Sequence, residues 1–127
     1  MIRIAVVEDE EYYVNQLTGY LNEYQKTEKE ELDITVYRDG DAVTAEYKSQ
    51  FDIILMDIQM PVMNGYEAAQ AIRSSTHPQS ATIPIIAMTA NAFAEDIKNA
   101  LSAGMNAHIA KPIDPQKLYE TLAAYIK

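Results

Sequence analysis

The feature that most constrains the fold is a repeated alternation between short apolar segments and segments with helical periodicity. Because a strand followed by a helix returns to the same sheet by a right-handed crossover, this alternation predicts an α/β fold: a single, doubly wound sheet of five parallel strands with helices on both faces. Two stretches, IAVV and IILM, are apolar throughout, as is typical of strands buried on both faces. The predicted strands are IRIAVV (2–7), LDITVY (32–37), DIILM (52–56), IPIIAM (83–88) and AHIA (107–110).

The first three helical patterns differ in strength. The second, after Asp39-Gly40, is short and weak, and the third opens at Asn64-Gly65. The first predicts an amphipathic helix, because its apolar residues recur at i, i+3 and i+4 spacing. These residues are Tyr13, Leu17, Tyr20, Leu21 and Tyr24 for the first helix, and Ala68, Ala69 and Ile72 for the third.

The last two helices have defined ends. The fourth ends at Gly104, which suits the left-handed residue that follows a helix. The fifth opens with Asp114 as its N-cap and Pro115 at its first helical position. The predicted apolar faces comprise Phe93, Ile97 and Leu101 in the fourth helix, and Leu118, Leu122 and Ile126 in the fifth. The only long irregular stretch is the polar segment 74–82.

Length and composition exclude several classes of protein. A chain of 127 residues that is 48% hydrophobic predicts one domain, spanning 1–127, with a single core. The absence of cysteine excludes disulfides and thiolate metal sites, and no apolar run reaches the roughly 18 residues that span a bilayer. We therefore expect a soluble, cytoplasmic protein. The net charge of −9 opposes direct contact with nucleic acid or an anionic membrane.

Polar side chains follow four of the predicted strands at the point where each strand ends. Glu8 and Asp9 follow the first strand, and Asp57 follows the third. Thr89 follows the fourth strand and Lys111 the fifth. Because ligands of open parallel sheets bind beyond the carboxyl ends of the strands, we expect these side chains to converge on one edge. Each has an ordinary structural explanation on its own, as a turn former, helix cap or surface lysine, so the prediction depends on their joint placement.

Three carboxylates at one edge predict a metal site. They raise one another's pKa unless a cation lies among them. Since the available ligands are oxygens, with no cysteine or histidine nearby, Mg²⁺ is the predicted ion, with Mn²⁺ as the alternative. We expect Asp9 and Asp57 to bind it directly, Glu8 to act through water, and the backbone carbonyl of Gln59 to complete the set.

A magnesium ion beside a carboxylate, an ammonium and a hydroxyl can stabilise a phosphoryl group during transfer. Asp57 can then act as the nucleophile. The apolar strand before it holds the carboxylate rigidly at the edge, and Pro61 and Asn64-Gly65 turn the chain away into the third helix. The sequence therefore predicts an aspartate that accepts phosphate.

The whole chain closely resembles the receiver domain of two-component response regulators. The motifs VVEDE, ILMDIQMPVMNG, IIAMTANA and HIAKPID occur in the family's order and spacing. The resemblance implies a flavodoxin-like fold with strand order 2-1-3-4-5, and phosphorylation of Asp57 by a partner histidine kinase or phosphotransfer protein. It also implies that Glu8 and Asp9 hold Mg²⁺. Lys111 would contact the phosphoryl oxygens, and Thr89 would be the switch hydroxyl.

The chain departs from the common family pattern at several positions. His108 stands where the switch residue is usually Tyr or Phe, and Glu8 where many members have aspartate. We hypothesise that a neutral His108 packs inward when Thr89 moves toward the phosphoryl group, whereas a protonated ring resists burial. Gln59 and Asn91 occupy positions that tune the lifetime of the phosphoryl group.

The resemblance also implies a regulatory protein, with only slow self-dephosphorylation. Phosphorylation would shift the surface of the fourth helix, fifth strand and fifth helix, which an output domain or effector reads, and a phosphorylation-dependent homodimer is a further expectation. Met1 directly before the first strand favours a chain that begins with its receiver, whereas TANAFAEDI and AKPID are more similar to receivers of hybrid kinases. The sequence leaves both arrangements open.

Three alternative functions are weighed against this one. A Mg²⁺-dependent phosphatase of the haloacid dehalogenase type needs a second aspartate two residues after the nucleophile, where this chain has Gln59. A flavodoxin-like FMN protein needs a first loop that accepts phosphate, whereas EDEE is negatively charged. A receiver that signals without phosphorylation is disfavoured because every required side chain is present.

Overall fold

The computed structural model describes residues 2–45, 51–60, 63–75, 82–90 and 94–125. Five parallel strands form one sheet in the order β2-β1-β3-β4-β5, which confirms the predicted topology. The strands are β1 Ile2–Val7, β2 Leu32–Tyr37, β3 Ile53–Asp57, β4 Ile85–Thr89 and β5 Ala107–Ala110. The helices are α1 Glu11–Glu28, α2 Gly40–Ala45, α3 Gly65–Ser74, α4 Ala94–Ser102 and α5 Pro115–Tyr125.

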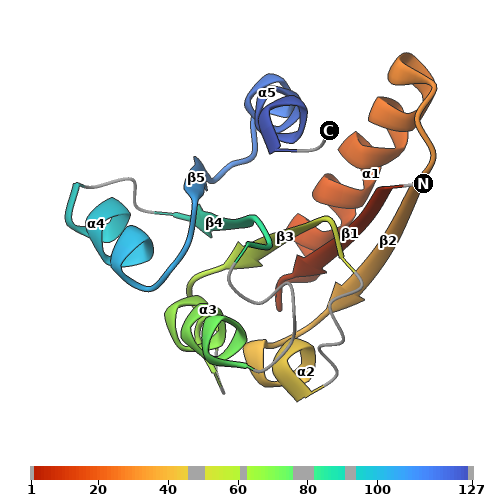
Figure 1. The fold of residues 1–127 in the computed structure, drawn as a ribbon. Coiled ribbons are helices and arrows are strands. Elements are labelled where there is room, and N and C mark those ends of the chain that lie inside the picture. Colours follow the sequence, from red (N-terminus) through yellow and green to blue (C-terminus); the bar gives the residue numbers. More distant parts are fainter. Residues whose placement is uncertain (1, 46–50, 61–62, 76–81, 91–93, 126–127) are drawn as a thin grey trace.

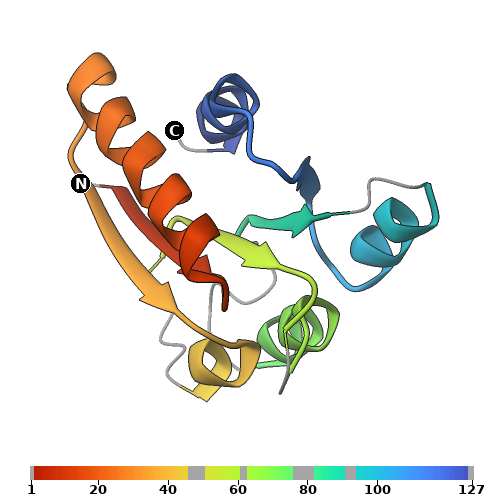
Figure 2. The same cartoon turned by 180° about the vertical axis from the view of Figure 1, so that it is seen from behind.

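The sheet separates two layers of helices. Helices α1 and α5 cover one face, and α2, α3 and α4 cover the other (Figures 1 and 2). Successive side chains of a strand point to opposite faces, so Ile4 and Val6 pack toward α1 and α5, whereas Ala5 and Val7 pack toward the other layer. Burial on both faces explains why β1, β3 and β4 are so apolar.

The register of the sheet brings the polar strand ends together. Asp57 in β3 lies level with Met88 in β4, and Thr89 in β4 lies level with Ala110 in β5. Lys111 follows Ala110 directly. Parallel pairing therefore sets the polar residues that follow β1 and β5 and those that end β3 and β4 at one edge, as the sequence predicts.

Local signals fix the chain immediately after this edge. Asn64 caps α3 as predicted: its side-chain oxygen accepts a hydrogen bond from the Glu67 backbone N–H at 2.9 Å, and Glu67 accepts one from the Asn64 N–H at 3.1 Å. A Cβ at Gly65 would lie 2.5 Å from the Asp57 carbonyl oxygen, so only glycine allows this close approach. The turn after Asp57 is thus tightly packed against the strand that carries it.

The ends of the later helices also agree with the prediction. Gly104 has a φ of 100°, the left-handed conformation expected after α4. The Asp114 carboxylate accepts a hydrogen bond from the Gln116 N–H at 3.0 Å and so caps α5. The predicted loop at 74–82 lies mostly outside the described residues, as does Ile126.

The apolar face predicted for the fourth helix is wrong at Leu101, whereas Ile97 is half-buried. Leu101 is 55% exposed, whereas Ala100 and Ala103 are buried against the core, so α4 packs through its small side chains. Phe93 lies outside the described residues. The buried face of α1 is centred on Leu17 and Leu21 as expected, with Tyr13, Tyr20 and Tyr24 half-buried at its margins. Within the part of the chain that the structure describes, no helix combines the length and hydrophobicity of a membrane span.

Candidate functional site

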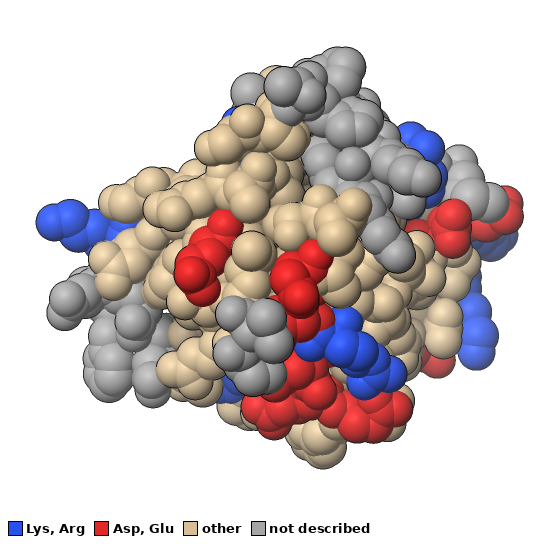
Figure 3. All heavy atoms as spheres, turned by 90° about the horizontal axis from the view of Figure 1, so that it is seen from below, with Lys and Arg blue, Asp and Glu red and all other residues tan. Residues whose placement is uncertain are grey.

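The five predicted site residues lie at one edge of the sheet. Glu8 and Asp9 directly follow β1, Asp57 and Thr89 end β3 and β4, and Lys111 directly follows β5. The side chains of Glu8, Asp57 and Thr89 are buried, which is unusual for polar groups at strand ends. Acidic side chains gather on the side of the molecule toward which β1 and β2 run, with basic side chains beside them (Figures 1 and 3).

Lys111 joins two of the carboxylates. Its Nζ lies 2.6 Å from Glu8 Oε1 and 3.1 Å from Asp57 Oδ1, and its side chain is only 4% exposed. A buried ion pair is stable only when each charge has close partners, which this arrangement provides. Lys111 is therefore the cation that balances Glu8 and Asp57 in this structure.

Burial perturbs all three charged groups. Burial, together with the charge of Asp57, raises the pKa of Glu8 to about 7, against the lowering effect of its hydrogen bond to Lys111. Burial likewise raises the pKa of Asp57, and Lys111 opposes this shift. For Lys111, burial alone would lower the pKa, but Glu8 and Asp57 together raise it above its ordinary value. The ammonium thus stays charged, while the carboxylates are held in an environment that calls for more positive charge.

The first loop offers a set of oxygen ligands for a metal ion. One carboxylate oxygen from each of Glu8, Asp9 and Glu10 lies within 4.8 Å of the others. Asp9 Oδ1 is buried and has no hydrogen-bond partner among the residues that the structure describes. A buried carboxylate oxygen without a donor fits a hard divalent cation such as Mg²⁺. The residues present therefore fit the ion that the sequence predicts.

Glu10 was not among the predicted ligands. Glu10 lies next to Asp9 in the EDEE run and is the N-cap residue of α1. Its backbone N–H donates a hydrogen bond to Glu8 Oε2 at 3.2 Å. The run of acids was the signal that could have identified it. Gln59 lies two residues after the end of β3 and is exposed.

Tyr13 is a further neighbour of the site that sequence reasoning missed. Lys111 Nζ lies 4.1 Å from the centroid of the Tyr13 ring, close enough for a cation–π interaction. Tyr12 packs edge-to-face on Tyr13, with the two ring centroids 5.1 Å apart. The sequence identified Tyr13 only as part of the apolar face of α1, because a contact with a residue 98 positions later leaves no local signal.

The structure describes the predicted switch residue His108 but not the predicted tuning residue Asn91. His108 lies in β5 level with Ala87, and its side chain is exposed. The inward position of the hypothesised switch is therefore not the one occupied in this structure. Asn91 lies outside the described residues.

Comparison with known proteins identifies the family. The family model of the response regulator receiver domain matches residues 4–123. The chain is 39% identical over 104 residues to a hybrid signal transduction histidine kinase of Dictyostelium discoideum, and 43% identical over 84 residues to the histidine-protein kinase BarA of Escherichia coli. These matches cover 77% and 66% of this chain but only 6% and 9% of those proteins, so the chain corresponds to a small part of them.

Solved receiver structures have the same fold. The receiver domain of a sensor histidine kinase from Pseudomonas aeruginosa, with a magnesium ion coordinated in its active site cleft, is 33% identical and has a TM-score of 0.85 over 98% of this chain and 97% of that one. A receiver domain from Saccharomyces cerevisiae, solved with a histidine phosphotransfer protein, is 25% identical with a TM-score of 0.82, over 98% of this chain and 88% of that one. This chain belongs to the family of response regulator receiver domains.

Proposed function

We propose that the chain is a phosphorylation-activated signalling switch in which Asp57 accepts a phosphoryl group from a histidine kinase or a phosphotransfer protein. The observation that carries this proposal is the position of Asp57, which is 3% exposed at the end of β3 and 3.1 Å from the Lys111 ammonium. Burial raises the pKa of Asp57, and the neighbouring Lys111 opposes this rise, which favours the ionised form of the nucleophile. Only an ionised carboxylate can attack phosphorus.

The residues of the first loop supply the metal site. Glu8 and Asp9 would hold Mg²⁺, with Glu10 in reach of the same position. Mg²⁺ supplies positive charge that stabilises the phosphoryl oxygens during transfer. An Asp57 oxygen forms the new bond to phosphorus while the bond between phosphorus and the donor histidine nitrogen breaks, and that nitrogen keeps the electron pair.

Lys111 and Thr89 respond to the new charge. The Lys111 ammonium exchanges its contact with the Asp57 carboxylate for one with a phosphoryl oxygen, because the phosphoryl group offers more hydrogen-bond acceptors. Thr89 ends β4 at the same edge, and its buried hydroxyl donates to the phosphoryl group. These movements bias the chain between an inactive and an active arrangement.

The surface of α4, β5 and α5 transmits the change. β5 pairs directly with β4, which ends at Thr89, so a movement of Thr89 reaches β5 without an intervening element. Leu101 on α4 and His108 on β5 are both exposed and available to an output domain, an effector or a second copy of the chain. His108 moves inward in the active arrangement, and its protonation opposes that movement.

Incubation with Mg²⁺ and acetyl phosphate, followed by intact-mass measurement, tests the proposal. Wild type gains one phosphoryl group, and chelation of the metal prevents the gain. Asp57→Asn does not react, whereas Asp52→Asn, the same substitution just before the start of β3, reacts like wild type. A label on another residue, or an adduct that persists in Asp57→Asn, contradicts the assignment. Transfer from a phosphorylated histidine phosphotransfer protein then tests the donor class.

A further inference from the structure

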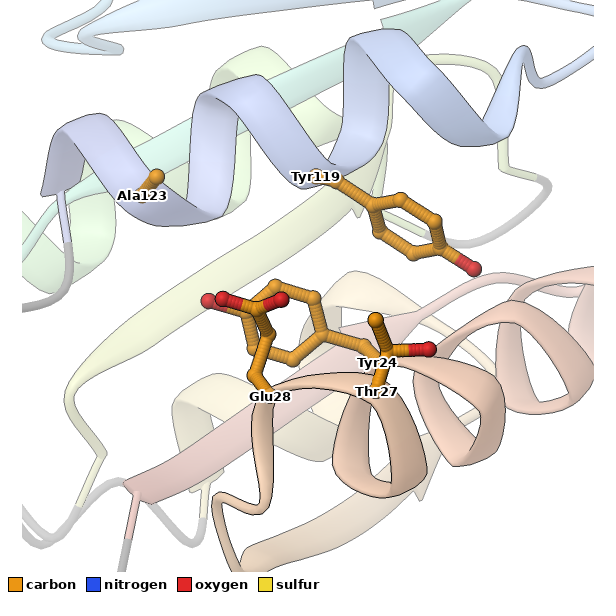
Figure 4. Close-up of a pocket in the computed structure, with 5 residues that line it drawn as sticks. All are labelled: Tyr24, Thr27, Glu28, Tyr119 and Ala123. Atoms are coloured by element: carbon orange, nitrogen blue, oxygen red, sulfur yellow. The ribbon is translucent and has the colours of Figure 1, made fainter.

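A cavity between α1 and α5 lies away from the phosphorylation site. Its volume is about 150 Å³, and it is lined by Tyr24, Thr27, Glu28, Tyr119 and Ala123 (Figure 4). The first three residues come from the C-terminal turns of α1 and the last two from α5. Tyr24 follows Glu11, the first residue of α1, by 13 positions, which places the cavity about 20 Å along the helix from the acidic first loop.

Two aromatic rings form walls of this cavity. The centroids of Tyr24 and Tyr119 are 5.5 Å apart and their planes are tilted by 40°. The Tyr119 hydroxyl donates a hydrogen bond to the Tyr20 carbonyl at 3.0 Å, which fixes its ring and directs the hydroxyl away from Glu28 (Figure 4). The cavity is therefore lined by rings, whose faces carry negative electrostatic potential.

Of the described residues that line the cavity, only Glu28 carries a charge. Glu28 lies one helical turn after Tyr24 and lines the same cavity (Figure 4), and Glu28 makes no ion pair within the described part of the chain. Burial, with the charges of Glu28 and Glu30, raises the pKa of Tyr24, and burial with the charge of Glu23 raises that of Tyr119. Aromatic faces beside an unpaired carboxylate attract a cation and repel an anion.

We propose that this cavity binds the guanidinium group of an arginine side chain presented by a partner protein. A planar, weakly hydrated guanidinium stacks on tyrosine and pairs with a carboxylate better than an ammonium does. A volume of about 150 Å³ holds this group and its adjoining methylenes, since one water takes about 30 Å³. The formal charge of −9 favours a basic partner. Such a partner can bind whether or not Asp57 is phosphorylated, so the proposal does not depend on the proposed function.

Titration of the ¹⁵N-labelled chain with N-acetyl-arginine-N-methylamide, followed by NMR, tests the proposal. The backbone amides of Thr27, Glu28 and Ala123 shift and saturate, with a dissociation constant in the millimolar range typical of one small group. N-acetyl-citrulline-N-methylamide, which has the same shape without the charge, produces no saturable shift at these positions. Equal responses to the two probes, or shifts only elsewhere, overturn the proposal.

Two substitutions separate the charge from the rings. Glu28→Gln weakens binding of the arginine probe about two- to fivefold, the usual effect of losing an exposed ion pair. Tyr24→Leu removes one ring and abolishes the saturable shift, while the other resonances remain dispersed as in the folded chain. Asp41→Asn, on the opposite layer of helices, removes the same charge and leaves the affinity unchanged. Unchanged affinity in Glu28→Gln, or an equal loss in Asp41→Asn, overturns the assignment to this cavity.

Discussion

At the residue scale, the burial of Glu8 makes the stability of the metal-free chain depend on pH. Because its pKa rises from 4.5 to about 7 on folding, the folded chain binds more protons between these values than the unfolded chain does. Raising the pH through this window therefore lowers the free energy of unfolding, by on the order of 2–3 kcal/mol for this group. Urea unfolding in EDTA at pH 5 and pH 7.5 measures the loss. Glu8→Gln shows a smaller loss than wild type, and equal losses in the two proteins contradict the prediction.

We expect Tyr13 to act on the proposed phosphorylation of Asp57 through Lys111. Its ring lies over the ammonium at 4.1 Å and helps to hold it beside Asp57. Tyr13→Phe keeps the aromatic face and phosphorylates at the wild-type rate, whereas Tyr13→Leu loses about 1 kcal/mol of cation–π energy and slows about fivefold. The rate of adduct formation with acetyl phosphate at saturating Mg²⁺ measures both. A slow Tyr13→Phe would assign the effect to the hydroxyl instead of the ring.

At the scale of elements, Arg73 links α3 by hydrogen bonds to the segments that precede β4 and β5. Its Nε and Nη2 donate to the Gly104 carbonyl at 2.9 and 2.7 Å, and its Nη1 donates to the Ile83 carbonyl at 2.7 Å. Arg73→Lys cannot reproduce this fork, and we expect it to lower the free energy of unfolding by about 2–3 kcal/mol. Chemical denaturation measures the change, with the exposed Gln70→Ala on the same helix as control. A loss no larger than that of the control contradicts the prediction.

The strands were predictable from the sequence, whereas the buried face of α4 and one contact at the site were not. Predicted strands agree with β1, β2 and β5 at both ends and with β3 and β4 within two residues. Burial on both faces gives β1, β3 and β4 continuous apolar runs, whereas the edge strands β2 and β5 are only partly buried. The buried face of α4 was missed because alanines supply it, and Leu101 is the more conspicuous apolar residue. Lys111 at the site was predictable from its strand end, but its contact with Tyr13 joins distant segments and had no local signal.

At the scale of the whole molecule, we expect the proposed metal binding to be coupled to folding through the edge of the sheet. The carboxylates of the first loop lie close together only in the folded chain, so Mg²⁺ binds the folded state in preference to the unfolded one. At ten times its dissociation constant, Mg²⁺ therefore stabilises the chain by about 1.4 kcal/mol. For a chain of 127 residues this corresponds to a rise in melting temperature of about 5 °C.

Thermal unfolding with and without Mg²⁺ tests this coupling and locates it. Asp9→Asn loses most of the rise, since its carboxylate contains the buried oxygen that has no hydrogen-bond partner among the described residues. Asp41→Asn, which removes the same charge on α2, keeps the full rise and so excludes a general effect of charge screening. Equal rises in both variants would mean that Mg²⁺ acts on the overall charge of −9 and not at the first loop.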